Sequence, residues 1–272
     1  MNRTAIVNRA RRLAAALALA CVPAMAAAQG SGIERPDASV LQHGDLVWPK
    51  NPKSIVPYDS SAASTSDAQK RQWEAERNAF VARVRDPKSG AGKDMLQLAT
   101  NMEALTYTEF QVRYLAGVSP LDIVKYGGGD DLLYVGHVGI IEVAPDGKRF
   151  VIEAVWGSVK AVQRVAYEDW LKQRADSWVW VGRIRDLNAQ AGAAFVAQAK
   201  SYIGKPYDFW NFDLADESGF YCSKLVWLSL VRAAKVAVDD NPDPGRMFWL
   251  SPKQVWNSVR MMRINVPREY AY

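Results

Sequence analysis

Cysteine and histidine are scarce in this sequence of 272 residues, which holds two of each. The two histidines, His43 and His137, are far apart in the chain, and neither has cysteines or histidines at the close spacing of zinc ligands. The sequence therefore predicts no metal site. It also lacks a phosphate-binding loop and a dinucleotide-binding fingerprint, so it predicts no cofactor. We find no internal repeat in the sequence.

Long hydrophobic runs are missing as well. The apolar run Leu13–Val22 is too short to span a bilayer, and it follows a segment with four arginines. Small residues up to Ala28 come next, which is the pattern of a secretory signal peptide. We expect residues 1–28 to be removed and the protein to be periplasmic or secreted. Cys21 follows an imperfect lipobox, so a lipid anchor is the alternative, and only then do we expect contact with a membrane.

The mature chain also lacks a strong net charge. Loss of four arginines from 34 basic residues leaves 30, against 29 acidic residues. The basic character of the full chain belongs mainly to the signal peptide. Nucleic acid is thus excluded as an expected partner, because its recognition depends on a basic surface. The remaining length is consistent with one domain, residues 29–272.

Cys222 is the one cysteine expected in the mature protein. Export favours an oxidising compartment, where an unpaired thiol is a liability unless it is buried or used. Here an irregular aromatic stretch changes to an apolar pattern at helical spacing, which predicts a helix over Cys222–Val236. A thiol in the first turn of a helix faces the positive end of the helix dipole, which favours the thiolate. A small buried core residue is the alternative reading.

The rest of the mature chain predicts a mixture of helices and strands. Helical patterns cover Ser66–Arg85 and Asp94–Leu115, and these two helices would form an insertion at about 50–130. Further on, Leu132–Val143 and Phe150–Val155 predict two strands joined by a turn at Asp146-Gly147.

His137 and Glu153 lie on opposite sides of this predicted turn. Antiparallel pairing places their side chains on neighbouring strands, where a carboxylate can orient an imidazole. Glu142 is the competing acid, but its odd separation from His137 predicts the opposite face of the sheet. His43 lies in a turn before Asp45, and we expect it to be exposed rather than catalytic.

Five short motifs in this order resemble the permuted branch of the NlpC-type papain-like superfamily, the YiiX-like group. The resemblance covers residues 41–50 and 132–258. The histidine strand comes before the cysteine helix, which is the permuted order. The motifs are His43-Gly44-Asp45-Leu46-Val47-Trp48, Gly136-His137-Val138-Gly139-Ile140-Ile141, Ile152-Glu153-Ala154-Val155, Gly204-Lys205-Pro206-Tyr207-Asp208 and Tyr221-Cys222-Ser223-Lys224-Leu225-Val226-Trp227.

The resemblance implies an α+β fold, in which a small, mostly antiparallel sheet packs on helices in a papain-like core with a two-helix insertion. It implies Cys222 as nucleophile, His137 as base and Glu153 as the orienting residue. It also places Tyr207 near the substrate groove. Lys224 departs from the pattern, which has an acid there, and we expect this cation to lower the pKa of the thiol or to contact an anionic substrate.

Together these features predict an exported cysteine amidase or peptidase. Its substrate would be a small peptide or another amide, with cell-wall peptide as the candidate that export and the resemblance suggest. Two alternatives stay open. One is a lipid-acyl hydrolase or acyltransferase that uses the same thiol, and the other is a binding domain without catalysis.

Overall fold

A computed structural model describes residues 35–50, 67–110, 136–156, 159–245 and 250–267. These segments contain a six-stranded sheet in which every neighbouring pair is antiparallel, in the order β4-β3-β2-β1-β5-β6. The strands are β1 (Leu46–Lys50), β2 (Gly139–Val143), β3 (Arg149–Val155), β4 (Ala161–Ala166), β5 (Trp178–Ile184) and β6 (Met261–Asn265). The predicted α+β class with a small antiparallel sheet is confirmed.

The β2–β3 hairpin turns where the sequence predicts. Gly147 has a φ of 81°, which a residue with a side chain rarely adopts, and the Asp146 carboxylate accepts the N–H of Lys148. The resulting register pairs Ile140 with Ile152. Gly139 therefore lies opposite Glu153, which brings the residues just before β2 beside the end of β3.

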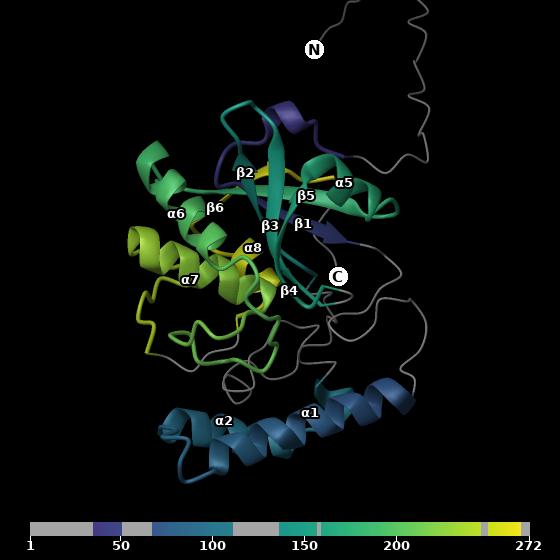
Figure 1. The fold of residues 1–272 in the computed structure, drawn as a ribbon, viewed down its shortest axis with the longest axis vertical. Coiled ribbons are helices and arrows are strands. Elements are labelled where there is room, and N and C mark those ends of the chain that lie inside the picture. Colours follow the sequence, from purple (N-terminus) through teal and green to yellow (C-terminus); the bar gives the residue numbers. More distant parts are fainter. Residues whose placement is uncertain (1–34, 51–66, 111–135, 157–158, 246–249, 268–272) are drawn as a thin grey trace, which may run out of the picture. The chain divides into compact units, whose positions relative to one another are not determined.

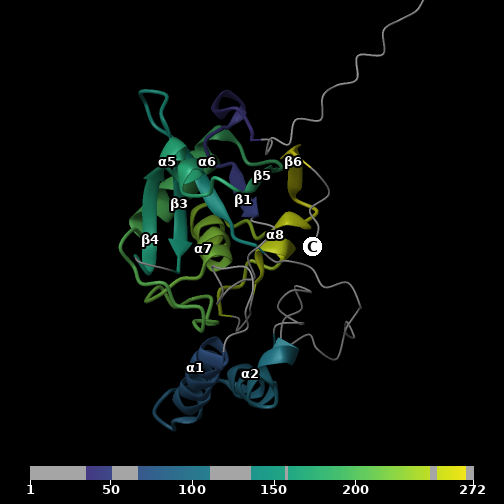
Figure 2. The ribbon, with the colours of Figure 1, turned by 90° about the vertical axis from the view of Figure 1, so that its right-hand side faces the viewer.

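Helices cover both faces of the sheet, as Figures 1 and 2 show. One face packs against α6 and α7, and the other against the short α5. The side chains of each strand alternate between these two layers, so Ile140 joins the first core and Ile141 the second. The helices are α5 (Tyr167–Lys172), α6 (Ala189–Ser201), α7 (Cys222–Ala234) and α8 (Pro252–Trp256), and a 3₁₀ turn covers Ala38–Val40.

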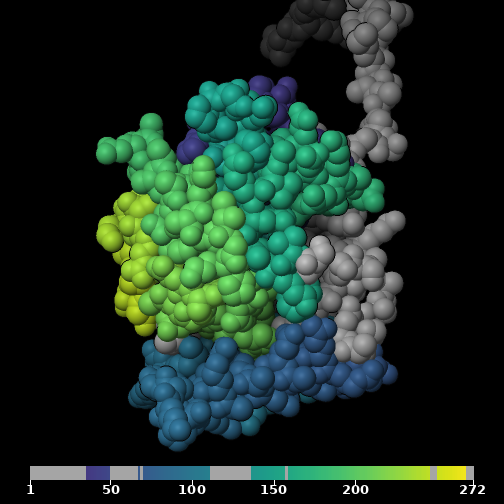
Figure 3. All heavy atoms as spheres, in the orientation of Figure 1, coloured from purple at the N-terminus to yellow at the C-terminus, as the bar shows by residue number. Residues whose placement is uncertain are grey.

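The predicted insertion contains a helical hairpin, α1 (Asp67–Arg85) and α2 (Lys93–Glu103). Its apolar face packs on the segment that leads into α7 (Figure 3). The contact is mainly aromatic, and Arg83 and Glu76 add hydrogen bonds to Trp210. Its buried aromatic members are Trp73, Phe80, Tyr107, Phe110, Phe209, Trp210, Phe212 and Tyr221.

The structure corrects two predicted elements and adds one strand. The helix expected over residues 94–115 ends at Glu103, because Thr106 and Glu109 form reciprocal hydrogen bonds that start a new helical segment. The strand expected over residues 132–143 begins at Gly139, although its first four residues lie outside the described segments. Strand β4 was not predicted, because its polar and apolar residues do not alternate clearly.

The described residues all belong to one compact unit. The expected signal-peptide boundary at residue 28 lies outside them and stays a prediction. Within the described segments, none of the helices has both the length and the apolar character needed to span a bilayer.

Candidate active site

Cys222 is the first residue of α7. The preceding residue, Tyr221, is extended, so the chain enters the helix at the cysteine itself. The thiol side chain is almost fully buried, and its sulfur accepts the backbone N–H groups of Val138 and Ser223. Burial alone would raise the pKa of the Cys222 thiol, but the positive charge of His137 and these donors outweigh it and lower the pKa.

His137 lies between this thiol and a carboxylate. Its Nε2 is 2.8 Å from Oε2 of Glu153, and its side chain also shares a hydrogen bond with Cys222. Because Nε2 contacts the carboxylate, Nδ1 is the nitrogen left for the sulfur. Burial would lower the pKa of the imidazole, but the negative charges of Cys222 and Glu153 raise it to about 9. The two shifts favour a thiolate–imidazolium pair.

Glu153 is fully buried at the far end of this chain of contacts. Besides its contact with His137, Glu153 accepts a hydrogen bond from Nε1 of Trp170, at 2.7 Å, and another from Nε2 of Gln163, at 2.9 Å. Nη2 of Arg174 lies 3.1 and 3.0 Å from its two oxygens. Burial would raise the pKa of this carboxyl, but the Arg174 charge and the donors lower it to about 2. Glu153 is thus held ionised and in one orientation.

Arg174 should therefore stabilise the protein through Glu153. In Arg174→Met the buried carboxylate loses its cation, and we expect about 3 kcal/mol less free energy of unfolding at neutral pH. The pKa of Glu153 is depressed from 4.5 to about 2, so this stabilisation is complete above pH 4.5 and is lost as the pH falls through about 2. Urea unfolding of both proteins across this range measures it.

Arg85→Met is the matched control for Arg174→Met. Arg85 also pairs with a glutamate, Glu103, but both side chains are about half exposed. We expect a loss below about 1 kcal/mol for this exposed pair. Equal losses in the two variants, or a loss in Arg174→Met that does not change with pH, would contradict the role of Arg174.

Tyr207 is the fourth predicted residue that the structure places at this site. It forms a parallel bridge with Phe220, and its ring packs against both the sheet core and the aromatic cluster of the α1–α2 hairpin. Burial and then the negative charge of Cys222 raise the pKa of its hydroxyl, which places the phenol within electrostatic reach of the thiol. Because Phe220 precedes Cys222 by two residues, this bridge places Tyr207 beside the segment that carries the thiol.

Lys224 lies elsewhere, and its expected contact with substrate is corrected. Its side chain is fully buried, and Nζ donates to the backbone oxygens of Asn211 at 3.2 Å and Asp213 at 2.6 Å. Burial lowers the pKa of its ammonium to about 8, against the opposing effect of nearby carboxylates. An enclosed ammonium cannot touch a substrate in this conformation, so Lys224 braces the loop before α7.

The competing acid Glu142 lies on the opposite face of the sheet from Glu153. Its oxygens contact Nε of Arg164 at 2.5 Å and Nζ of Lys200, in α6, at 2.6 Å. This agrees with the face predicted from its odd separation from His137. Asp45 is also buried, and Arg183 contacts both of its oxygens, at 2.7 and 2.9 Å. These carboxylates brace the sheet.

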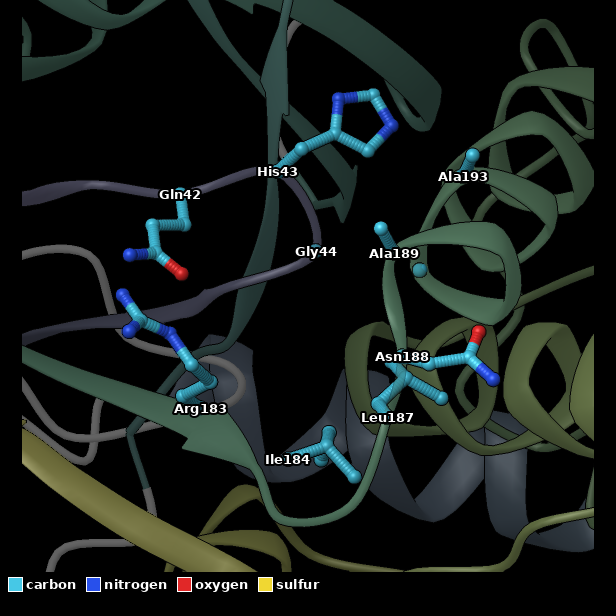
Figure 4. A pocket seen from close by; sticks show the side chains of 10 residues that line it. Gln42, His43, Gly44, Arg183, Ile184, Leu187, Asn188, Ala189 and Ala193 are labelled. Carbon is cyan, nitrogen blue, oxygen red and sulfur yellow. The ribbon is translucent and has the colours of Figure 1, made fainter.

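His43 is exposed, as predicted, and borders a hollow of about 470 Å³ (Figure 4). Its Nδ1 accepts the N–H of Val143 at the end of β2, whereas His137 precedes the start of that strand. The five residues of β2 alone span roughly 16 Å, so this hollow is remote from Cys222. It is lined by Gln42, His43, Gly44, Arg183, Ile184, Leu187, Asn188, Ala189, Gly192 and Ala193.

Sequence reasoning missed the residues that hold Glu153. Gln163 lies directly opposite Glu153 in the register of β3 and β4, and it was missed together with β4. Trp170 lies on α5 and Arg174 two residues beyond its end, and the sequence of this short helix gives no sign of its contact with the sheet. A signal did exist, because a carboxylate among apolar strand residues needs buried donors.

Among the described residues, no three potential ligands are grouped as a metal ion would require.

Comparison with known proteins identifies the family. Residues 130–266 match the model of the permuted papain-like amidase family, YaeF/YiiX, C92 family, and the chain belongs to this family. The region contains Cys222, His137 and Glu153, and the family implies a cysteine hydrolase of the amidase type.

One solved structure was also found to be similar, a protein described as metalloprotein yiiX from Escherichia coli O157:H7. It is 17% identical, with a TM-score of 0.42, and the match covers 82% of this chain and 96% of that one. No curated protein matches the sequence.

Proposed function

We propose that the protein hydrolyses amide bonds with Cys222 as nucleophile, His137 as acid and base, and Glu153 as the residue that orients His137. One observation carries this proposal. A buried carboxylate, an imidazole and a thiol at a helix start form a continuous chain of hydrogen bonds, and the pKa shifts favour the ion pair that attacks. A thiolate is the nucleophilic form of cysteine.

In the first half of the reaction, the Cys222 thiolate attacks the carbonyl carbon of the amide and forms a carbon–sulfur bond. The imidazolium of His137 then gives its proton to the leaving nitrogen as the carbon–nitrogen bond breaks, and the amine departs. In the second half, His137 takes a proton from water, whose oxygen attacks the thioester. The carbon–sulfur bond breaks, the acid leaves, and the proton on His137 restores the ion pair.

The negative oxygen formed during attack needs a donor near the sulfur. The first N–H groups of a helix have no acceptor within the helix, so the backbone N–H of Cys222, at the start of α7, is the proposed donor. Glu153 keeps its charge throughout, because its depressed pKa prevents it from taking the proton of His137.

We further propose that the protein is exported and acts on peptides of the cell wall. The N-terminal signal-like segment supports export, and the amidase family supports an amide substrate. The lipid-acyl alternative uses the same thiol and differs in the bond that it breaks.

Purified cell-wall peptides and matched acyl esters test the bond type. We expect the mature protein to release new amines from the peptides and little acid from the esters, because the family that it matches is one of amidases. New amines are measured by derivatisation and mass spectrometry. Ester cleavage without peptide cleavage would favour the lipid-acyl hydrolase, and binding without any cleavage would favour the non-catalytic domain.

A further inference from the structure

Trp156 directly follows β3 and stands out because its large apolar side chain is 40% exposed. Side chains of β3 alternate, so that Glu153 faces α5 while Ile152 and Ala154 face α7. Trp156 follows Ile152 and Ala154 at the same spacing of two residues, so its side chain lies toward the face that carries Cys222. Its ring meets that of Tyr207 edge-on, with 5.7 Å between centroids. The ring of Tyr207 thus lies between Trp156 and the surroundings of the Cys222 thiol.

Lys160 places a positive charge beside the rings of Trp156 and Tyr207. Its Nζ lies 4.8 Å from the centre of the Trp156 ring, and the residue is exposed. Its backbone has a φ of 47°, an unfavourable conformation for a residue with a side chain. A hydrogen bond from the N–H of Tyr207 to the oxygen of Lys160, 2.8 Å long, holds it there.

The charges near Tyr207 and Trp156 differ in sign. Asp208 and Glu76 act on the phenol with negative charge, whereas Lys160 supplies positive charge beside Trp156. A bound anionic group is repelled by the two carboxylates and attracted by Lys160. An ammonium has three donors, so Lys160 can bind an anion while it lies over the indole.

We propose that Trp156 and Lys160 form a substrate-binding subsite beside Cys222 that selects a carboxylate carried on a short aliphatic stem. The stem packs on the exposed indole, and the carboxylate pairs with the Lys160 ammonium. The subsite rests on the proposed function, because it describes the substrate of that thiol. It implies that the preferred amides are peptides with a free carboxylate near the bond that is cleaved.

Alkylation of Cys222 by two matched probes tests the subsite without a known substrate. The probes are N-iodoacetyl aminohexanoic acid and its carboxamide, which share the reactive group and the stem and differ in one charge. Each rate is divided by the rate of iodoacetamide on the same variant, which cancels any change in the thiol itself. We expect Lys160→Gln to lower the acid-to-amide ratio about fivefold at low salt, and less at high salt.

Two further variants sharpen the test. Lys148→Gln removes an exposed lysine at the other end of β3 and should leave the ratio unchanged. Trp156→Ala should slow both stem-bearing probes about equally, because both lose the indole. These are the results that support the subsite.

Four results would overturn the subsite. The first two are an unchanged acid-to-amide ratio in Lys160→Gln and an equal fall of that ratio in Lys148→Gln. In either case, fast reaction with iodoacetamide would still support Cys222 as the nucleophile. If Trp156→Ala alters only binding to anionic phospholipid vesicles, the tryptophan serves a membrane surface instead. A Cys222 that iodoacetamide does not label at any pH would remove the proposed function and the subsite with it.

Discussion

Replacing Cys222 with alanine should abolish amide hydrolysis, with kcat falling about 10⁵-fold or more. The reason is chemical, because His137, Glu153 and the helix start then remain but have no nucleophile to activate. The fold should survive, since alanine replaces a small side chain in the first turn of α7 and removes only one sulfur atom. Turnover of cell-wall peptides and the thermal unfolding midpoint, measured on the same preparation, separate these effects.

Ser229→Ala is the matched control for Cys222→Ala. Ser229 lies on the same helix, is fully buried, and its hydroxyl has no hydrogen-bond partner among the described residues. Removal of this hydroxyl should leave turnover unchanged and should not lower the free energy of unfolding. Residual turnover above about 1% in Cys222→Ala would mean that another group attacks the substrate.

Replacing His137 with alanine should lower kcat/KM by about 10³- to 10⁵-fold. Two effects add here, because the variant loses both the proton donor for the leaving amine and the positive charge that lowers the pKa of the thiol. Glu153 keeps Trp170, Gln163 and Arg174 as partners, so the buried carboxylate stays neutralised. Steady-state kinetics with peptide substrate measures the loss.

His137→Gln separates the two roles of the imidazole. Its amide can still donate to Glu153, but it cannot carry the proton or the charge. We expect it to lower kcat/KM as much as His137→Ala while it stabilises the fold better. Activity near that of the native protein in His137→Gln would show that the imidazole only fills space between Glu153 and Cys222.

The central pair of the site was predictable because local rules determine it. A strong turn at Asp146-Gly147 sets the register of the hairpin, and the register places His137 and Glu153 on one face. The change from an aromatic loop to helical spacing marks the start of α7 at Cys222. Each of these inferences needs only neighbouring residues and the period of a strand or helix.

The partners that tune the site were not predictable in the same way. Gln163 meets Glu153 through a strand with a weak pattern, and Arg174 reaches it from beyond a separate helix. A lysine at position 224, where the family pattern has an acid, predicts an effect on the thiol or contact with an anionic substrate. The helix, however, turns its side chain under the loop of Asn211 and Asp213. Such contacts depend on how distant segments pack, which periodicity does not encode.

The rate of Cys222 alkylation by iodoacetamide as a function of pH tests the central claim most directly, with native mature protein and His137→Ala compared. If Cys222 and His137 form an ion pair, the native thiol should titrate with an apparent pKa well below the roughly 8.5 of a free thiol. His137→Ala should raise this value. A thiol that reacts only at high pH or not at all, with the same profile in His137→Ala, would contradict the account.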